Sequence, residues 1–516
     1  MSADARGIAL LAAAAGAGVL QALSIAWPGN GQPQWWLQLL SLAGLVVILQ
    51  RSPSPWRATL AAWLFATAWL TASWWWLFIS LHTYGGLAAP LAGLAVLGLA
   101  AFLSLYYAAA GGVYRWLARG HISQAMVLFA ALWLTAELLR VRWFTGFPWG
   151  AGGYAHVDGP LAFLAPWIGV HGIGFLAAAL AVLLASLLRR EARGSLRSWI
   201  AVAGAAGLLA ACNVATERLQ PLEPGGPKLT VALLQGNIPQ DEKFEGGSGI
   251  PLALNWYADA LAKAGASLVV TPETAIPVLP QQLPEGYLEA VRKQFSTGTR
   301  AALVGIPLGS FSQGYTNSVI GLQPGDSGYR YHKHHLVPFG EFIPPLFKWF
   351  TRMMNIPLGD FNRGGVGQPS FLWQGERLAP NVCYEDLFGE ELGARFLDPA
   401  LAPTIFVNVS NIGWFGNTVA IDQHLHISRM RALEFDRPMI RATNTGPTVI
   451  IDRRGRVTHA LPRHTRGVLT GEVEGGRRIT PYAAWVSRTG LWPLWVLGLG
   501  VPLLAWARRR RAGPYN

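Results

Sequence analysis

Long apolar runs separated by short polar connections dominate the first 213 residues of the chain. Seven of them approach the roughly 20 residues that a helix needs to cross a membrane, and an eighth lies near the C-terminus. The runs cover 8–27, 36–49, 56–81, 87–117, 122–139, 161–188, 199–212 and 491–506. The pattern predicts eight transmembrane helices, seven within a membrane domain over 1–216 and the eighth over 489–507. The first run follows Arg6 and is expected to be retained, because six similar runs follow it without a convincing cleavage site.

Residues 228–475 have a different hydrophobic pattern, in which short β-type runs alternate with amphipathic stretches. The expected strands cover 229–234, 267–270, 301–306, 317–322, 377–383, 404–409 and 448–452. The expected helices cover 255–264, 285–294, 390–396 and 423–435. This alternation predicts one α/β domain of about 250 residues. A linker that carries Pro and Gly precedes it at 217–227.

Composition supports the membrane interpretation. Of the 516 residues 52% are hydrophobic and only 13% are charged, whereas soluble domains have about 25% charged residues. A net charge of +13 would suit a nucleic-acid-binding protein, but the basic residues flank apolar runs and no nucleic-acid motif accompanies them. We therefore expect no nucleic-acid partner. We interpret the basic residues as the ones that set the orientation of the helices in the membrane.

The arginines predict the orientation of the spans, because short cytoplasmic loops collect Lys and Arg. Basic residues occur in alternate connections and in the tail, at Arg51, Arg57, Arg115, Arg119, Arg189, Arg190, Arg193, Arg197 and Arg508 to Arg511. Both termini, including the basic tail 508–516, are then cytoplasmic, and residues 213–489 lie outside the cytoplasm. Arg140 and Arg142 fall on the outer side and disagree with this rule. Two interpretations stay open for them: functional or lipid-headgroup contacts, or ordinary exceptions.

An apolar loop between Phe342 and Phe361 has no obvious place in an α/β core. Its apolar side chains are Ile343, Leu346, Phe347, Trp349, Phe350, Met353 and Met354. On the outer side of a membrane protein such a loop would dip into lipid or cover a site. The alternative is a core helix.

Cys383 is the candidate nucleophile of the chain. The apolar run 378–382 leads into it and the acidic pair Glu385-Asp386 follows, which predicts a strand-to-helix turn at the thiol. The other cysteine, Cys212, lies inside an apolar run. Two cysteines cannot make a disulfide framework, and no Cys/His cluster has ligand spacing, so neither a metal nor another cofactor is expected.

Two polar residues could activate this thiol. A thiol attacks only as thiolate, so a nearby lysine such as Lys333 would favour the reactive form and later donate to an oxyanion, together with the N–H of Tyr384. Glu273 follows the apolar residues 268–270 and would emerge at the carboxyl end of a strand, in position to move protons. Each residue alone has an ordinary explanation. Cys383 could be an inert cysteine, Lys333 a solvated lysine between two histidines, and Glu273 part of a helix start. Only the joint pattern points to a site.

The joint pattern resembles the Glu-Lys-Cys triad of the nitrilase superfamily. Pro272-Glu273, Lys333 running into the segment 336–341, and Cys383-Tyr384-Glu385 occur in that order. The membrane runs on both sides, with the motifs at 234–240, 411–416 and 441–446, are similar to the apolipoprotein N-acyltransferase family in particular. The resemblance covers nearly the whole chain.

The resemblance implies an αββα sandwich in the periplasm, anchored in the bacterial inner membrane, and a transfer in two steps. Cys383 would take an acyl chain from a phospholipid, with phosphatidylethanolamine the expected donor. The α-amine of a diacylglyceryl-cysteine at the N-terminus of an apolipoprotein would then collect it. A monomer is expected through the same resemblance.

The resemblance also implies roles for individual side chains. Glu273 matches the general base, Lys333 the oxyanion stabiliser and Cys383 the nucleophile. Supporting or substrate-binding positions are matched by Glu341, Glu385, Tyr384, Asn317, Trp414, Phe244 and Trp149. Phe244 departs from the family, which has tryptophan there: an aromatic surface is retained, but the indole N–H donor is lost.

Two other classes of protein compete with a membrane acyltransferase. A membrane-anchored amidase acting on a soluble C–N compound would use the same triad, but eight spans exceed what tethering requires. A transporter or binding protein would need polar residues in its spans, and Glu137 is the main acidic one. Retention of Glu, Lys and Cys together would be odd in such a protein.

Overall fold

The computed structural model describes residues 3–118, 121–187, 226–325, 327–343 and 361–511, together with isolated positions between 200 and 211. The chain forms two compact units. The first, called the helical unit below, comprises Met1–Leu77, Ala89–Pro221 and Leu491–Asn516. The second, called the sandwich unit, comprises Phe78–Ala88 and Leu222–Gly490.

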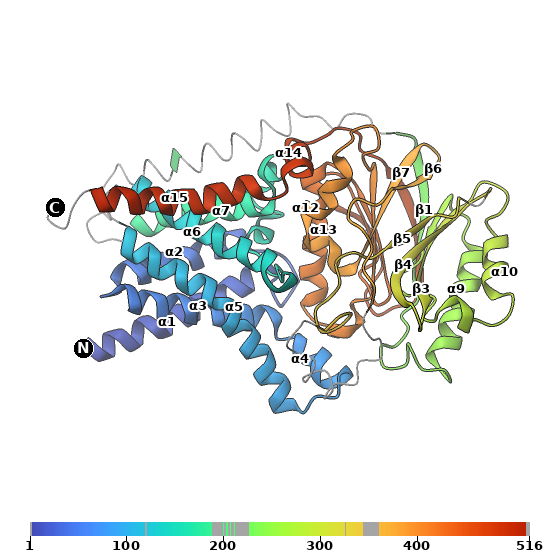
Figure 1. The fold of residues 1–516 in the computed structure, drawn as a ribbon, viewed down its shortest axis with the longest axis horizontal. Helices are drawn as coiled ribbons and strands as arrows, with labels where there is room; N and C mark the ends of the chain where they lie inside the picture. Colours follow the sequence, from blue (N-terminus) through green and yellow to red (C-terminus); the bar gives the residue numbers. More distant parts are fainter. Residues whose placement is uncertain are drawn as a thin grey trace. The chain divides into compact units, whose positions relative to one another are not determined.

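Long apolar helices make up the described part of the helical unit (Figure 1). They are α1 (Ala3–Ile25), α2 (Trp35–Arg51), α3 (Pro55–Trp74), α5 (Ala89–Leu117), α6 (Ile122–Arg142), α7 (Ala165–Leu187) and α15 (Trp492–Arg511). The hydroxyl of Ser54 accepts a hydrogen bond from the N–H of Arg57, which caps the start of α3. Inside the unit the rings of Trp69 and Trp133 stack at 5.5 Å between centroids, so aromatic side chains of α3 and α6 form part of its core.

The number of membrane spans is smaller than the sequence predicts. Four described helices are long and apolar enough to cross a membrane, or six if each of two broken helix pairs counts as one span. α2 corresponds to the expected run 36–49, but it has only 17 residues. The expected run 199–212 lies largely outside the described residues. Eight spans are therefore not reached within the part of the chain that the structure describes.

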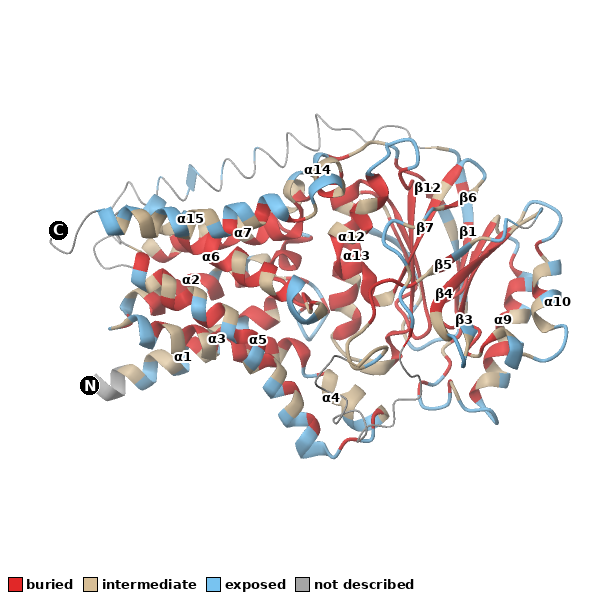
Figure 2. Ribbon diagram, viewed as in Figure 1, coloured by how far each residue is buried: buried red, intermediate tan, exposed pale blue. Residues whose placement is uncertain are grey.

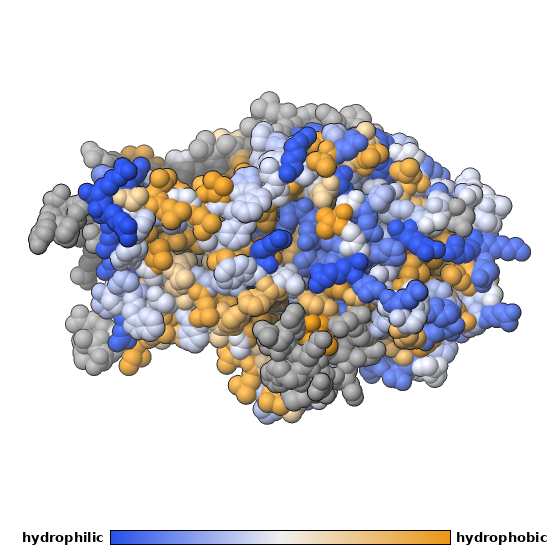
Figure 3. Space-filling view, viewed as in Figure 1, coloured by the Kyte–Doolittle hydropathy of each residue, from blue (hydrophilic) through white to orange (hydrophobic). Residues whose placement is uncertain are grey.

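The surface of the helical unit exposes large apolar side chains, visible as orange patches over the helices in Figure 3. They include Leu91, Leu94, Leu97, Phe102, Leu105, Val496, Leu503 and Leu504. In a water-soluble domain such a surface would be an aggregation hazard. Helices solvated by lipid instead expose apolar residues, so this surface fits the candidate spans.

The expected run 56–81 is not one continuous helix. After α3 the chain forms α4 (Leu77–Ile79) and the π-helical turn η1 (Ser80–Tyr84). The next turn uses Gly86 at φ +68°, a conformation that favours glycine. The hydroxyl of Ser80 donates to the carbonyl of Trp414 at 2.7 Å, so this segment packs within the sandwich unit. Its partner lies 334 residues away, which a hydrophobicity pattern cannot reveal.

Two six-stranded sheets form the centre of the sandwich unit. The first has the order β12-β1-β2-β3-β4-β5, with β1 (Lys228–Gln235), β2 (Leu268–Val270), β3 (Ala301–Ser310), β4 (Gly314–Leu322), β5 (Arg330–His332) and β12 (Gly467–Glu474). The second has the order β11-β10-β9-β8-β7-β6, with β6 (Phe371–Trp373), β7 (Glu376–Val382), β8 (Ile405–Ser410), β9 (Met439–Thr443), β10 (Val449–Ile451) and β11 (Val457–Ala460). In each sheet the three consecutive strands β1-β2-β3 or β7-β8-β9 are parallel, so their carboxyl ends share one edge.

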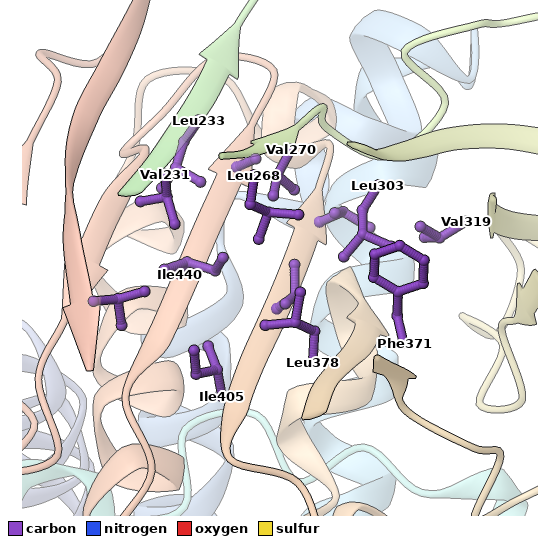
Figure 4. Close-up of a cluster of buried hydrophobic side chains, with 14 of the residues drawn as sticks. Val231, Leu233, Leu268, Val270, Leu303, Val319, Phe371, Leu378, Ile405 and Ile440 are labelled. Carbon is purple, nitrogen blue, oxygen red and sulfur yellow. The ribbon is translucent and has the colours of Figure 1, made fainter. Parts of the chain in front are cut away.

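Helices cover the outer face of each sheet, which gives the αββα layers (Figures 1 and 2). α9 (Gly249–Lys263) and α10 (Tyr287–Lys293) cover the first sheet, and α12 (Gly389–Gly393) and α13 (Ala420–Phe435) cover the second. α14 (Pro481–Thr489) packs against α12 and α13. Apolar side chains of the two sheets meet in one buried cluster, shown in Figure 4, that includes Val231, Val270, Leu378 and Ile440. This core fixes the two sets of parallel strands against each other.

All seven expected strands and all four expected helices of the sandwich unit are confirmed, with shifted ends. The sequence analysis missed five strands: β5, β6, β9, β11 and β12. β5 and β6 have three residues each, too few for a visible alternation. Every residue of β11 is exposed, so no apolar side of that strand marks it.

Several expectations fall outside the described residues. They concern Cys212, most of the linker 217–227, and the apolar loop between Phe342 and Phe361, of which 344–360 are not described.

Candidate active site

Cys383 lies directly after β7, at the carboxyl end of a parallel strand. A short 3₁₀ helix, η6 (Cys383–Leu387), begins at the cysteine, so the expected strand-to-helix turn is present. The residue has φ +53°, in the left-handed region that non-glycine residues rarely adopt. Such local strain persists where surrounding contacts enforce it, and it is common at functional sites. The side chain is only partly buried.

Four polar side chains from two loops and one strand meet through hydrogen bonds close to this turn. Lys333, which follows β5, donates from Nζ to Glu341 Oε1 at 2.9 Å and to Glu273 Oε1 at 3.3 Å. Asn317 of β4 donates from Nδ2 to the same two oxygens, at 2.7 Å to Glu273 and 2.9 Å to Glu341. Lys333 is 1% exposed and Glu273 is 7% exposed, so this ion-pair network is almost dry. The sequence analysis predicted all four residues as site candidates.

The charges of the network act in opposite directions on Lys333 and Cys383. Burial alone would disfavour the ammonium, but the carboxylates of Glu341 and Glu273 raise the pKa of Lys333 well above its usual value. Burial and the Glu273 carboxylate raise the pKa of the Cys383 thiol, and Lys333 only partly opposes them. Lys333 thus favours the thiolate, as the sequence analysis expected, but burial and Glu273 outweigh it and leave the thiol protonated. A protonated thiol beside a carboxylate is arranged to lose its proton as it attacks.

The Glu385 carboxylate holds the turn at Cys383 and the segment after Lys333 together. Its Oε2 accepts from the N–H of Val382 at 2.6 Å and from the hydroxyl of Tyr331 at 2.7 Å. Its Oε1 accepts from the N–H of His334 at 2.7 Å. Glu385 is fully buried, and despite that burial the contacts with His334 lower its pKa to about 2.

Two histidines after Lys333 extend this contact to α12. His334 Nδ1 lies 2.7 Å from Glu385 Oε1, and His334 Nε2 lies 2.8 Å from Glu391 Oε2. Burial opposes a charged imidazole here, but the two carboxylates raise the pKa of His334 to about 9. His335 Nδ1 lies 2.9 Å from the same oxygen of Glu391. The segment that carries Lys333 is thus fixed at both of the next two positions.

A second buried network lies behind Cys383. His424 of α13 donates from Nε2 to the Cys383 carbonyl at 3.1 Å and to Asp386 Oδ1 at 2.8 Å. Arg441 donates to His424 Nδ1 at 2.6 Å, which fixes the imidazole tautomer, because a guanidinium can only donate. Ser428 donates to Asp386 Oδ2 at 2.5 Å. The sequence analysis did not single out His424 or Ser428, since nothing near them in the sequence marks their partners.

The three motifs noted in the sequence meet around Glu273. Asn411, after β8, donates its main-chain N–H to Glu273 Oε2 at 2.8 Å and its amide to Gln240 Oε1 at 2.8 Å. Asn444, after β9, donates to Asn411 Oδ1 at 3.2 Å. It also holds both the N–H and the carbonyl of Ile238. β1 is parallel to β2 and β8 is parallel to both β7 and β9, so the motifs follow the carboxyl ends of parallel strands.

Two protein-family models match the chain. The apolipoprotein N-acyltransferase N-terminal domain matches residues 17–183, and carbon–nitrogen hydrolase matches residues 230–480. An apolipoprotein N-acyltransferase of Verminephrobacter eiseniae is 60% identical over 92% of both chains. One of Ralstonia nicotianae is 46% identical over 93% of this chain and 90% of its own. The chain belongs to the apolipoprotein N-acyltransferase family.

Membership makes the protein an acyltransferase with a carbon–nitrogen hydrolase catalytic domain, and it does not favour the alternative of an amidase. Among solved structures, an amidase of the nitrilase superfamily from Nesterenkonia is 20% identical. Its alignment covers 53% of this chain and 100% of the amidase, with a TM-score of 0.37.

Aromatic residues of this acyltransferase surround the loop after Asn411. Trp414 stacks on Phe244 at 6.5 Å between ring centroids, and Tyr84 meets Trp414 edge-on at 5.7 Å. Phe244 therefore supplies an aromatic contact to Trp414, although it lacks an indole N–H. Tyr384, next to the cysteine, is 3% exposed and packs against the Phe388 ring at 5.3 Å.

Trp149 is the one predicted site residue that lies in the helical unit. Its ring packs against Trp76 at 4.9 Å. Its carbonyl accepts hydrogen bonds from Trp74 Nε1 at 3.0 Å and from Arg140 Nη1 at 2.7 Å. Glu137, which lies in α6 like Arg140, accepts a hydrogen bond from the N–H of Gly152 at 3.1 Å. Buried polar side chains of α6 thus hold the loop that contains Trp149, which gives Arg140 a role in packing.

The sequence analysis missed one buried cation near Glu273. Lys243 donates from Nζ to the Glu273 carbonyl at 3.1 Å and to Thr274 Oγ1 at 2.8 Å. It lies in a charged stretch, 241–245, that looks like a solvated loop. The available signal was its place between two predicted site features, Gln240 and Phe244.

Proposed function

We propose that this acyltransferase moves an acyl chain from a phospholipid, through a thioester on Cys383, to the α-amine of the S-diacylglyceryl-cysteine that begins an apolipoprotein. Phosphatidylethanolamine is the proposed donor. The observation that carries the proposal is the buried network in which Lys333 and Asn317 join the carboxylates of Glu273 and Glu341.

The first half of the reaction acylates the enzyme. The Cys383 thiol attacks the ester carbonyl while Glu273 takes its proton, which forms the carbon–sulfur bond and a tetrahedral oxyanion. The Lys333 ammonium and the N–H of Tyr384 donate to this oxyanion. Collapse of this tetrahedral intermediate breaks the carbon–oxygen bond of the ester, and the departing lysophospholipid takes the proton from Glu273. The raised pKa of Cys383 supports this order, because the proton leaves only as the bond forms.

The second half discharges the enzyme. The free α-amine attacks the thioester, Glu273 takes a proton from the nitrogen, and Lys333 again faces the oxyanion. Collapse breaks the carbon–sulfur bond, and the proton returns from Glu273 to the sulfur. Both lipid substrates can use one site in turn, because the covalent intermediate separates the two steps in time.

The remaining assignments describe the setting of this chemistry. A membrane domain over 1–216 with seven spans, an eighth span over 489–507 and a cytoplasmic tail over 508–516 would place the catalytic domain, 228–475, in the periplasm. The bacterial inner membrane supplies the donor lipid and holds the apolipoprotein. Alternating arginines support this orientation. The enzyme works as a monomer, because one chain contributes every proposed group.

Intact-mass spectrometry tests the proposal directly. Purified protein in detergent, given phosphatidylethanolamine without an acceptor, should gain the mass of one acyl chain on Cys383. Cys383→Ser should gain none as a thioester, and Glu273→Gln should stay unacylated while its circular dichroism matches the wild type. An unchanged wild-type mass, with full turnover by Cys383→Ser, would remove the mechanism.

A further inference from the structure

Lys243 is a second buried lysine near Cys383. It is not one of the three proposed catalytic residues. It lies in the segment between β1 and α9 and is 2% exposed. Its Nζ bonds to the main-chain carbonyl of Glu273 and to the hydroxyl of Thr274, the residue after the proposed base. Thr274 has φ +47°, so the lysine holds a loop whose backbone is strained at that point.

The two buried lysines are bound in different ways. Lys333 lies between two carboxylates, which keep it charged. Lys243 donates to a carbonyl and to a hydroxyl, both of which are neutral. Neutral acceptors compensate burial less well than carboxylates do. Burial accordingly lowers the pKa of Lys243 to about 8, against the opposing influence of Glu273 and Cys383.

The buried charges around the thiol balance only if Lys243 is counted. Glu273 and Glu341 bring two negative charges to the described site, and Lys333 brings one positive charge. Two further buried carboxylates have cations of their own: Asp386 is offset by Arg441 through their shared partners His424 and Ser428, and Glu385 is offset by His334. The ammonium of Lys243 completes the balance. A dry site with one uncompensated negative charge would oppose any further negative charge on sulfur or oxygen.

Other charged groups near Lys243 do not change this balance. Across from it, the groups whose charges act on it are Glu273 and Cys383. On its own segment the carboxylates are Asp241, Glu242 and Glu245, and all three residues are exposed. Water screens their charges, whereas the interaction between buried groups is screened much less.

We propose that Lys243 is a positioning residue for acyl transfer: it holds the Glu273 loop and supplies the cation that balances the negative charge formed at Cys383 and the oxyanion. This inference rests on the proposed function. The protons move as described above, from the thiol to Glu273 and on to the leaving group, and Lys243 keeps its own proton throughout. A site whose Lys243 has lost its proton should acylate slowly.

The pH profile of acylation separates this role from a purely structural one. Full-length protein in detergent is mixed with phosphatidylethanolamine at pH values from about 6 to about 10. The reaction is quenched at intervals, and intact-mass spectrometry measures the acylated fraction. Wild-type acylation should fall through a basic limb near pH 8, where Lys243 titrates. Lys243→Met should acylate roughly tenfold more slowly at neutral pH and lack this limb, a smaller loss than removal of a direct oxyanion donor causes. Lys243→Arg should keep the neutral rate and move the limb to higher pH.

Lys263 offers the matched control, because its side chain is 75% exposed and pairs with Asp259 on the surface of α9. Lys263→Met should keep both the rate and the limb. A Lys243→Met profile with the wild-type limb would overturn the role of Lys243. If that variant does not fold, an unmoved limb in Lys243→Arg overturns it equally. Absence of any Cys383 thioester in the wild type would instead overturn the proposed function itself.

Discussion

The Glu385 carboxylate accepts a hydrogen bond from the main-chain N–H of His334 at 2.7 Å and also meets the imidazole of that residue. Glu385 lies two residues after Cys383, and His334 lies one residue after Lys333. This single contact therefore ties together the two segments that carry the proposed nucleophile and the proposed oxyanion donor. It joins β7 of the second sheet to the end of β5 in the first.

Replacement of Glu385 by Gln should break that tie. The amide keeps one acceptor oxygen but turns an NH₂ group toward N–H or O–H donors of Val382, Tyr331 or His334. Removal of one partner from a buried ion pair costs about 3–5 kcal/mol, so we expect a large drop in the thermal midpoint and loss of acylation. Exposed Glu289 of α10 supplies the control, and Glu289→Gln should behave as wild type in both assays.

The pH dependence of stability should follow the same contact. The pKa of His334 is raised from 6.5 to about 9 in the fold, so its contribution is fully present below about pH 6.5 and is lost as the pH rises through about 9. Glu385 and Glu391 have pKa values lowered from 4.5 to about 2, so their contribution is lost as the pH falls from about 4.5 toward 2. Thermal midpoints should therefore be highest between these limits. In His334→Gln the alkaline decline should flatten, and an unchanged decline would contradict the assignment.

Asn317 is expected to be intolerant of a negative charge. Its amide donates to both Glu273 and Glu341, so Asn317→Asp would place a third carboxylate where two already converge on Lys333. Like charges at this separation raise carboxyl pKa values and compete for the ammonium. We expect acylation to fall roughly a hundredfold, as after loss of an oxyanion donor. Gln313→Glu, an exposed change in the turn between β3 and β4, should leave the acylation rate unchanged.

Arg441 should be needed mainly because it balances Asp386. Arg441→Met leaves that buried carboxylate without its cation and His424 without a donor, so a loss of about 3–5 kcal/mol in stability is expected. The double variant Asp386→Asn/Arg441→Met should recover part of this loss, because both charges are then absent. Chemical denaturation of the single and double variants measures the coupling. Purely additive losses would show that the two side chains act independently.

The sequence predicted the parts of the site that are marked locally. Glu273 and Cys383 each follow an apolar run that becomes a parallel strand, and position at a carboxyl strand end is visible in one dimension. His424 and Lys243 could not be found in this way. Their partners lie 38 to 41 and 30 to 31 residues away, and nothing in either neighbourhood marks the contact. The break after α3 was missed for the same reason, since Ser80 finds its partner in Trp414.

Arg140 provides a test of whether its positive charge or its shape matters. Its guanidinium donates to the carbonyls of Phe147 and Trp149 and lies over the rings of Trp69 and Trp74, at 5.3 and 5.7 Å from their centroids. Arg140→Lys keeps the charge, and with it any effect on topology, but a lysine cannot make this forked contact between two indoles.

We expect Arg140→Lys to lower the thermal midpoint by the equivalent of about 1.5–3 kcal/mol, the contribution of hydrogen bonds to a charged group. Arg142 lies two residues further along α6 and is exposed, which makes Arg142→Lys the matched control with an equal change in chemistry. Differential scanning fluorimetry in detergent measures both. If the two variants melt together with the wild type, the contacts of Arg140 add no stability. Its predicted place on the outer side would then be an ordinary exception to the charge rule.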